Sequence, residues 1–592
     1  MSYCLLCIQT LHTCNYINNI FVYNSILFIG NYYPCLYNYI IFVHHINNTL
    51  YLLVPYLETK NIAMSLTSAL WKIRYTLTSL LLEVPSSTNP VQLADVLFYC
   101  RNLKVLYFSA FGGSLSSALG DLERLKDSYQ SLIDLRLFVP LTITGKSLKS
   151  LVRWCPNLRR LILGVKCLPD DAIDVILDDC PNLEVLCYNN ERYDSDILLC
   201  LDDLNNNNNN NNKCNNISKD FLSSASATAI NSHQSNDNNV AGQLRILSTP
   251  TQKSYSPGVP ANQFVRLLQK NQRSLERIYA NISMTREQNV TGEPHAFISY
   301  IGVDVLTFNR LEHLSYVADI YGVMEKLFLN SIESSHSSLK FFEAVDSYNI
   351  PAIADTLIKI PPVQELKFFY RSNQAQHYTF QYYFGDEDQQ QQQDDTTAEQ
   401  SMTRLFKSYA SSCNNPQLSF PDVLNGSNSA RVLETVSFDA CTFITDNVLN
   451  ALAEVKTLKV LSFKGIVTGN KVTTQGFKSF LVKLGQNAKI TVLKLDSTNE
   501  VIKKHNADDI LRYIGKNMTW LDTLHLESLD YITYQGINDM VDVMKEKRLR
   551  YLKVSDCEET AEFEDKIEYH IKEYHPHVNL EIINDLGFGL FD

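Results

Sequence analysis

The sequence predicts an α/β solenoid, in which a short strand and a helix recur along the chain at a fixed period. The spacing L-x-x-L-x-L recurs, as at Leu433, Val436 and Phe438, and it places its last two apolar residues on one face of a strand. Between such strands, apolar residues fall at helical spacing. The pattern restarts at Leu458, 25 residues after Leu433, and a strand and helix of that period are typical of leucine-rich repeats.

Fifteen segments carry this strand pattern, so we expect about fifteen repeats. They begin at Leu77, Leu103, Leu132, Leu158 and Leu183, then at Leu244, Leu275, Leu311, Leu339 and Val363, and finally at Leu433, Leu458, Ile490, Leu521 and Leu549. The tetrapeptide Cys-Pro-Asn-Leu opens two of them, at 155–158 and 180–183. Because proline cannot continue a helix, each strand can begin at the following leucine.

Helix starts are also predicted. Thr445 and Asp446 can cap a helix whose apolar residues include Val448, Leu449 and Leu452.

Composition favours one long solenoid over most other classes. Hydrophobic residues make up 45% of the 592 residues and charged residues 20%, so residues 64–592 can bury a continuous core. The formal net charge is −12, with 52 Lys and Arg against 64 Asp and Glu. General nucleic-acid binding needs a basic surface, so we expect no nucleic-acid partner.

Residues 1–63 differ from the rest of the chain. No Lys, Arg, Asp or Glu occurs before Glu58, and Tyr, Asn, Ile and Phe dominate. The segment lacks the charged start and cleavage site of a signal peptide. Its apolar runs at 21–29 and 36–46 are about half as long as a membrane span requires, so no clear span is predicted. One interpretation is a gene-model artefact from AT-rich DNA, with Met64 as the true start. The alternative is an unstructured or weakly membrane-associated leader.

Two low-complexity inserts interrupt the repeats, at about 204–240 and 385–429. The first contains eight consecutive asparagines, 205–212, and the second contains an acidic glutamine-rich tract followed by a Ser/Asn-rich stretch. Polar segments of this kind bury too little apolar area to offset their ordering entropy. We therefore expect both to loop out of the solenoid and to be mobile and dispensable, with limited proteolysis cutting there first.

The fourteen cysteines favour neither disulfides nor a metal site. Five of them lie just before or just after predicted strands, where a small buried side chain fits: Cys100, Cys155, Cys180, Cys441 and Cys557. Cys4 and Cys7 form C-x-x-C, but no second pair lies at zinc-module spacing. Free thiols indicate a reducing compartment, cytoplasmic or nuclear.

A family resemblance follows from these motifs. Cys441-x-x-Ile444-Thr445-Asp446-x-x-Leu449-x-x-Leu452, together with the Cys-Pro-Asn-Leu joints, resembles the cysteine-containing, ribonuclease-inhibitor-like repeats of F-box proteins. The resemblance covers most of 74–557. It implies a right-handed, curved horseshoe with parallel strands on the concave face and helices outside.

The resemblance also implies partners. In that family the repeats recognise protein substrates of an SCF-type cullin ubiquitin ligase, and an N-terminal F-box binds the Skp adaptor. This sequence departs from the family in lacking an L-P-x-E-[IL]-L motif before the first repeat. Its nearest stretch is 53–58.

No catalytic constellation is found, so we expect no enzyme, no cofactor and no metal site. The glycines at 112–113, 465 and 469 follow strands but lack the lysine and serine of a phosphate loop. His313 and His525 occupy strand positions, where a histidine is more often packed or at a surface contact than a base.

Function is therefore expected on the concave surface, where the residues between the strand leucines lie. Aromatic residues and arginine, which are enriched at binding hot spots, are well represented there, although strand propensity alone also explains the aromatics. The candidate protein-binding residues are Tyr107, Arg136, Phe138, Tyr279, Phe341, Phe369, Lys494, His525, Glu527, Tyr551 and Lys553.

Two functions fit these observations. The first is a substrate-recognition subunit of a ubiquitin ligase, which holds a protein substrate on the concave face. The alternative is a leucine-rich repeat scaffold or adaptor without an F-box.

Overall fold

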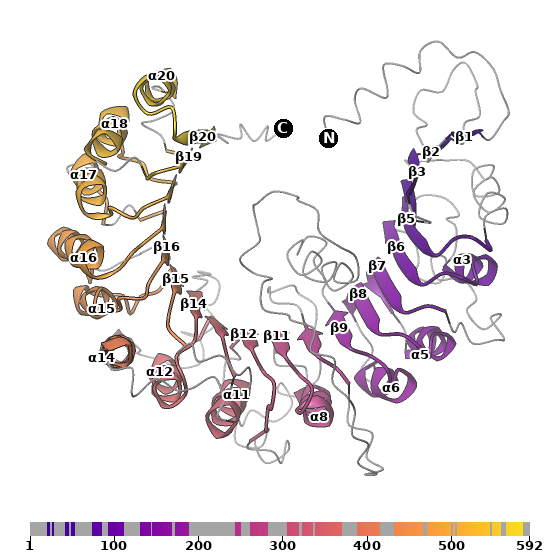
Figure 1. Ribbon diagram of the computed structural model, residues 1–592. Helices are drawn as coiled ribbons and strands as arrows, with labels where there is room; N and C mark the ends of the chain where they lie inside the picture. Colours follow the sequence, from indigo (N-terminus) through magenta and orange to yellow (C-terminus); the bar gives the residue numbers. More distant parts are fainter. Residues whose placement is uncertain are drawn as a thin grey trace. The chain divides into compact units, whose positions relative to one another are not determined.

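A computed structural model shows the architecture of the chain (Figure 1). It describes residues 21–23, 26–28, 42–46, 49–53, 74–85, 93–111, 131–143, 145–167, 172–188, 243–249, 261–281, 305–318, 323–335, 338–347, 349–369, 388–414, 431–465, 471–498, 501–503, 506–544, 548–557 and 564–583. The chain forms two compact units, Met1–Asn271 and Gln272–Asp592.

The first unit contains the strands β1 to β10. They are β1 (Phe21–Tyr23), β2 (Ile26–Phe28), β3 (Phe42–Ile46), β4 (Thr49–Leu53), β5 (Ser79–Pro85), β6 (Val105–Phe111), β7 (Asp134–Thr142), β8 (Arg160–Cys167), β9 (Val185–Tyr188) and β10 (Ile246–Ser248). Strands β1 to β4 pair antiparallel, whereas β4 to β10 pair in parallel, each with the next. The helices are α3 (Leu93–Tyr99), α5 (Gly145–Trp154), α6 (Ala172–Asp179) and α8 (Ala261–Asn271).

The described part of the second unit contains ten strands that also pair in parallel, each with the next. They are β11 (Arg277–Asn281), β12 (His313–Val317), β13 (Phe341–Val345), β14 (Glu365–Phe369), β15 (Thr435–Asp439), β16 (Val460–Lys464), β17 (Val492–Asp496), β18 (Thr523–Glu527), β19 (Tyr551–Ser555) and β20 (Asn579–Ile583). The helices are α11 (Val323–Ser334), α12 (Ile350–Lys359), α14 (Asp388–Asn414), α15 (Asp446–Leu452), α16 (Thr474–Asn487), α17 (Ala507–Asn517), α18 (Tyr534–Val543) and α20 (Glu564–Tyr574).

Both units therefore have the architecture of an α/β leucine-rich repeat solenoid, and the predicted fold class is confirmed. Each of the fifteen predicted strands is present, from β5 to β19. In each unit the described helices lie on one side of the strands (Figure 1).

The core lies between the strand layer and the helix layer. The pattern leucines occupy it: Leu461 of β16, for example, is 0% exposed and pairs with Val436 on one side and Leu493 on the other. Aromatic side chains extend the same stack, because Phe463 packs against Phe438 with ring centroids 5.9 Å apart. Since every repeat places its leucines in register, each turn buries the apolar edge of its neighbour.

Helix starts in the second unit are linked from one repeat to the next. Thr445 caps α15 by accepting a hydrogen bond from Val448 N, as the sequence predicts. The carboxylate of Asp446 accepts hydrogen bonds from the backbone N (3.0 Å) and the hydroxyl (2.7 Å) of Thr473, which caps the following helix. Gly476 lies so close to this carboxylate that a Cβ there would collide with it.

The same link recurs one pair of repeats later. Asp508 of α17 accepts from the backbone N (3.2 Å) and hydroxyl (2.9 Å) of Thr533, the N-cap of α18. Asp446 and Asp508 thus fix the start of the helix that follows their own, and at α15 the adjacent Thr445 and Asp446 serve two helices.

Strand ends in the second unit share a left-handed turn. The residue after the strand has a φ near +50° in six repeats: Asp346, Ala440, Gly465, Ser497, Ser528 and Asp556. In each case its backbone N donates to the carbonyl of the last residue of the next strand, as Ser528 N does to Ser555 O at 2.9 Å. This turn carries the chain out of the sheet while keeping its N–H bonded.

Two segments differ from the sequence-based expectation. β20 extends the second sheet by a strand that was not predicted, because His577 stands where the pattern has its first leucine. Part of the second insert, expected to loop out, forms α14, which packs against α12 and α15. Its side chains at Met402, Leu405 and Phe406 are fully buried, so this part of the insert supplies the helix of its repeat.

Other expectations concern cysteines, the leader and membrane spans. Among the residues that the structure describes, six cysteines are free and buried: Cys100, Cys155, Cys180, Cys187, Cys441 and Cys557. The first insert, 204–240, lies outside the described residues, and the proposed boundary at residue 63 stays a prediction. Among the helices that the structure describes, none has the length and apolar character needed to cross a membrane.

Candidate functional site

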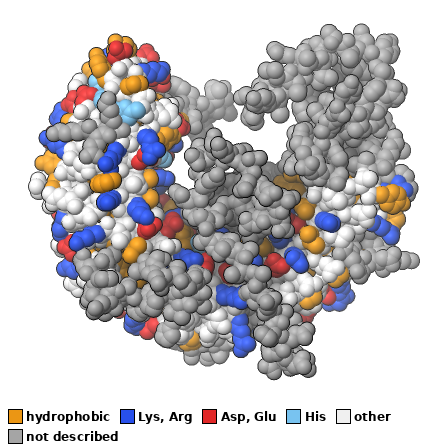
Figure 2. Space-filling view, viewed as in Figure 1, with side chains coloured by type: hydrophobic (Ala, Val, Ile, Leu, Met, Phe, Trp, Pro, Cys, Tyr) orange, Lys and Arg blue, Asp and Glu red, His pale blue; other side chains and the backbone are white. Residues whose placement is uncertain are grey.

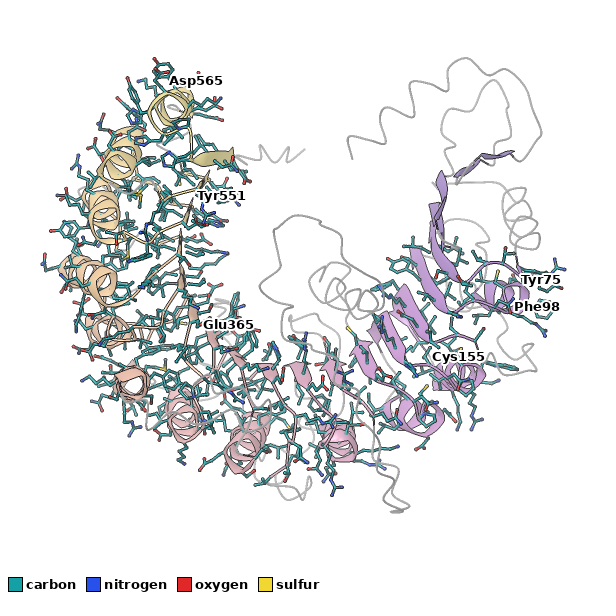
Figure 3. The ribbon with its side chains drawn as sticks, in the orientation of Figure 1. Tyr75, Phe98, Cys155, Glu365, Tyr551 and Asp565 are labelled. Carbon is teal, nitrogen blue, oxygen red and sulfur yellow. The ribbon has the colours of Figure 1, made fainter. Side chains whose placement is uncertain are left out.

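The side of the strands opposite the described helices presents side chains in rows. Along each strand, leucines point to the core and the residues between them point away. Because neighbouring strands pair in register, Lys494, His525 and Lys553 are direct partners across β17, β18 and β19. Equivalent positions in successive repeats therefore form continuous rows across the sheet, and Tyr551 in Figure 3 shows the side on which they lie.

Five of the expected binding residues come together on β17 to β19, and we call them the C-terminal patch: Lys494, His525, Glu527, Tyr551 and Lys553. Lys494, His525 and Lys553 form its basic row. Glu527 lies two residues further along β18 and pairs with Asp496, so a second, acidic row runs beside the first at a distance of about 7 Å.

His525 in the centre of the basic row is uncharged at neutral pH. Burial lowers the pKa of its imidazole to about 4, and the positive charges of Lys494 and Lys553 act in the same direction. The imidazole contacts the ring of Tyr551 edge-on, with centroids 5.5 Å apart. A neutral histidine between two lysines leaves both hydrogen-bonding and apolar surface at the middle of a positively charged row.

Tyr551 is held in place by a neighbouring strand. Its hydroxyl donates a hydrogen bond to the carboxylate of Glu581 on β20. Burial, followed by this carboxylate, raises the pKa of Tyr551 to about 12, so the phenol stays protonated. The unpredicted last strand therefore orients a residue of the patch.

On β16, the position in line with the acidic row is occupied by a cation, Lys464. Lys464 lies beside Asp496 at 3.0 Å, and this hydrogen bond is the main cause that raises the pKa of the lysine. In Figure 2, Lys and Arg side chains alternate with Asp and Glu over the described surface of this unit. The patch thus offers both signs of charge in an ordered, row-by-row arrangement.

Three other candidates lie on the first strands of this unit. Phe341 is only 5% exposed, because His313 stacks on it at 5.5 Å and the ammonium of Lys367 lies 5.0 Å from its ring centroid. Tyr279 and Phe369 are half-buried and lie on β11 and β14. Phe341 therefore has little surface for a partner, whereas Tyr279 and Phe369 keep part of theirs.

The remaining candidates belong to the first unit. The rings of Tyr107 and Phe138 are 5.1 Å apart, and Phe138 is 9% exposed. Arg136 pairs with the buried Asp134 at 3.2 Å. The sequence analysis did not single out Ile162, which packs in the same cluster. In the sequence, this cluster can be recognised because the residues between the pattern leucines are apolar there.

One group of possible metal ligands occurs among the residues that the structure describes: Asp542, His570 and His575. No metal site was expected from the sequence, because Cys4 and Cys7 have no second pair at zinc-module spacing. The pair His570-x-x-x-x-His575 was visible in the sequence, but its carboxylate partner lies 28 residues before His570.

Comparisons with known proteins give matches among solved structures. No protein-family model matches the sequence, and no curated protein matches it. The crystal structure of yeast Rad7 in complex with Elc1 matches with a TM-score of 0.32 and 13% identity, over 81% of this chain and 86% of that chain. The leucine-rich repeat-containing protein LegL7 from Legionella pneumophila matches with a TM-score of 0.26 and 12% identity, over 52% of this chain and 91% of that chain. The assignment of the fold accordingly depends on the repeat geometry described above.

Proposed function

We propose that this chain is a protein-binding module that holds its partner on the strand face, with the C-terminal patch as the centre of contact. The observation that carries the proposal is the in-register pairing of β17, β18 and β19, which aligns a basic row beside an acidic row. Charge rows of this kind select a partner by electrostatic complementarity and speed its association. A partner segment with acidic side chains along one line and basic ones along the next fits this pattern.

Binding, rather than catalysis, accounts for the chemistry of the patch. His525 is neutral and flanked by lysines, and Tyr551 is tied to Glu581. Both side chains are positioned as fixed contacts. Aromatic residues held in this way are favoured at binding hot spots because little side-chain entropy is lost when they bind.

The specific role that we propose is substrate recognition for an SCF-type cullin ubiquitin ligase, in the cytoplasm or nucleus. It is supported by the motif resemblance of the repeats around Cys441, Thr445 and Asp446 to those of F-box proteins. The alternative is a scaffold or adaptor that uses the same face without a ligase.

A charge reversal tests the binding surface. The double variant Lys494→Glu, Lys553→Glu should lower the association rate of the partner by at least tenfold at low salt, and the difference should shrink as salt is raised. Lys407→Glu is the matched control, because Lys407 is exposed on α14 in the helix layer. Partners captured by the native chain in cells, identified by cross-linking, supply the ligand for this measurement. Equal loss in the control and the double variant would place binding elsewhere.

Adaptor capture separates the two roles. The chain expressed from Met64 should bind its protein partner but should not capture the Skp adaptor, because adaptor binding needs a separate helical module. A gene product extended upstream to include such a module should capture the adaptor with the partner affinity unchanged. If the extended product also fails, the ligase role is excluded and the scaffold remains.

A further inference from the structure

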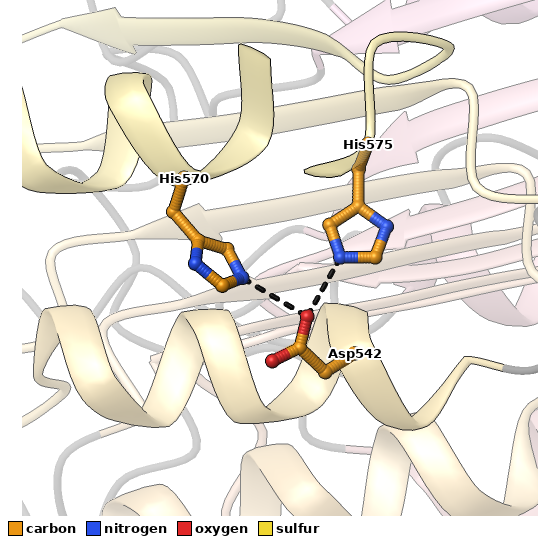
Figure 4. Close-up of side chains that lie close together, drawn as sticks. All are labelled: Asp542, His570 and His575. Atoms are coloured by element: carbon orange, nitrogen blue, oxygen red, sulfur yellow. Dashed lines mark hydrogen bonds and ion pairs between the residues drawn. The ribbon is translucent and has the colours of Figure 1, made fainter. Parts of the chain in front are cut away.

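Two histidines and an aspartate converge at the C-terminal end of the second unit (Figure 4). Nε2 of His570 lies 2.9 Å, and Nε2 of His575 2.7 Å, from the same oxygen, Oδ1 of Asp542. Asp542 belongs to α18, whereas His570 belongs to α20 and His575 follows its end. The cluster therefore joins two successive repeats outside the strand face.

The three side chains of the cluster are partly exposed to solvent, and the two imidazoles are fixed in position. The side chains of His570 and His575 are 21% and 14% exposed, and that of Asp542 is 48% exposed. His570 also packs against the ring of Tyr574, with centroids 4.9 Å apart, and the backbone N of His575 donates to Ile571 O at 2.8 Å. The two imidazoles are thus fixed by the helix end, while solvent can reach the carboxylate.

The donor set suits a divalent transition-metal ion. One ligand atom from each of the three residues lies within 4.8 Å of the other two. In a tetrahedral zinc site with bonds of about 2.0–2.1 Å, donor atoms are about 3.4 Å apart, so the two N···O distances of 2.9 and 2.7 Å would have to widen by about 0.5 and 0.7 Å to reach ligand geometry. Two imidazoles and one carboxylate are ligands that Zn²⁺ accepts, and three protein ligands leave one position open.

We propose that Asp542, His570 and His575 form a binding site for Zn²⁺ or a similar divalent transition-metal ion that joins α18 to α20. Because the ligands come from neighbouring repeats, the ion fixes the last helix to the array and with it β20, whose Glu581 orients Tyr551. Metal binding and partner binding at the C-terminal patch are consequently coupled. The metal site itself does not depend on the proposed function.

A cavity lies beside one of the proposed ligands. Asp542 also lines a cavity of about 680 Å³ between the ends of α17 and α18, to which Lys516 and Arg548 contribute positive charge.

Binding of Zn²⁺ and Co²⁺ to the full chain tests the proposal. After treatment with a chelator, the native chain should bind Zn²⁺ by calorimetry, and Co²⁺ should give the intense visible absorption of a tetrahedral site. Asp542→Asn, His570→Gln and His575→Gln should each lose one equivalent of metal or weaken its binding at least tenfold. The difference between native chain and variant is the measurement, because Cys4 and Cys7 can also bind metal.

A matched control and a measurement without mutation complete the test. Glu568→Gln removes an exposed carboxylate of the same helix, which pairs with Lys572, and should bind metal like the native chain. X-ray absorption at the zinc edge of the native chain should show two imidazole ligands at the site, even if a variant fails to fold. Equal stoichiometry and affinity in native chain and Asp542→Asn, or a zinc spectrum without imidazole ligands, would overturn the proposal. In that case the cluster is a pair of hydrogen bonds from two imidazoles to one carboxylate.

Discussion

Leu461 gives the sharpest test of the repeat core. Its side chain is 0% exposed in β16, between Val436 and Leu493 on the flanking strands. Leu461→Ala removes three carbon groups, which costs about 2.4 kcal/mol at about 0.8 kcal/mol per buried methylene. The cavity left behind adds to this, because packed neighbours collapse only partly. We expect a total loss of about 3–5 kcal/mol in the free energy of unfolding.

Leu461→Ala should destabilise the neighbouring repeats before it unfolds the whole array. Each repeat contacts only its neighbours, so hydrogen exchange should accelerate first in β15, β16 and β17. Urea unfolding followed by circular dichroism measures the total. The matched control is Ser462→Ala, the next residue of the same strand, which lies half-buried on the opposite side. It should change the free energy by less than about 0.5 kcal/mol. A loss below that value for Leu461→Ala, or the same loss in both variants, would refute the assigned register.

Three further predictions follow. Asp446→Ala removes the carboxylate that accepts hydrogen bonds from the backbone N and the hydroxyl of Thr473, and it should lower the free energy of unfolding in urea by about 1–2 kcal/mol. Asp446→Asn keeps one acceptor oxygen and should lower it by less. Burial raises the pKa of the Cys557 thiol to about 11, so the contribution of this thiol to stability is complete below about pH 9 and falls as the pH rises toward 11. Thiol reagents at pH 8 should therefore modify Cys557 only after the protein unfolds. Because the pKa of His525 is lowered to about 4, its contribution is complete above about pH 6.5 and is lost as the pH falls toward 4, and its NMR resonance should not titrate between about pH 8 and 5.5.

The strand layer was predictable because one physical requirement fixes it. Side chains at three places of each repeat must be buried, and from Leu77 to Leu549 nearly all of these side chains are apolar. β20 was missed because His577 occupies the first of these places, although Leu580 and Ile582 keep the other two in register. Pattern recognition therefore failed where one residue of the motif was polar.

Helix α14 was missed for a different reason. Its first turns are glutamines and aspartates, which gave the whole segment a polar composition. Met402, Leu405, Phe406 and Tyr409 nevertheless form a buried stripe at helical spacing. The average composition of the insert is polar and does not reveal this apolar periodicity. It is the apolar stripe that determines whether a helix can pack against its neighbours.

The rows of the candidate site were predictable from the pattern, but the exposure of each side chain was not. Lys494, His525 and Lys553 lie together because register alone places them there. Phe341 is covered by His313 and Lys367, which come from different repeats. Such coverage depends on the sizes of neighbouring side chains, so no single repeat reveals it.

The link from Asp446 to Thr473 gives the array a direction. Each carboxylate supports the helix that follows it in the chain, and therefore the one made later by the ribosome. A nascent repeat meets a finished docking point on its predecessor, so ordering can advance with translation. Shortening the chain from its C-terminal end leaves an unused acceptor in water, whereas shortening it from the N-terminal end as far as α16 or α18 removes the carboxylate that holds the N-cap threonine of that helix. Trimmed versions of this protein should consequently tolerate loss of their last repeats better than loss of their first.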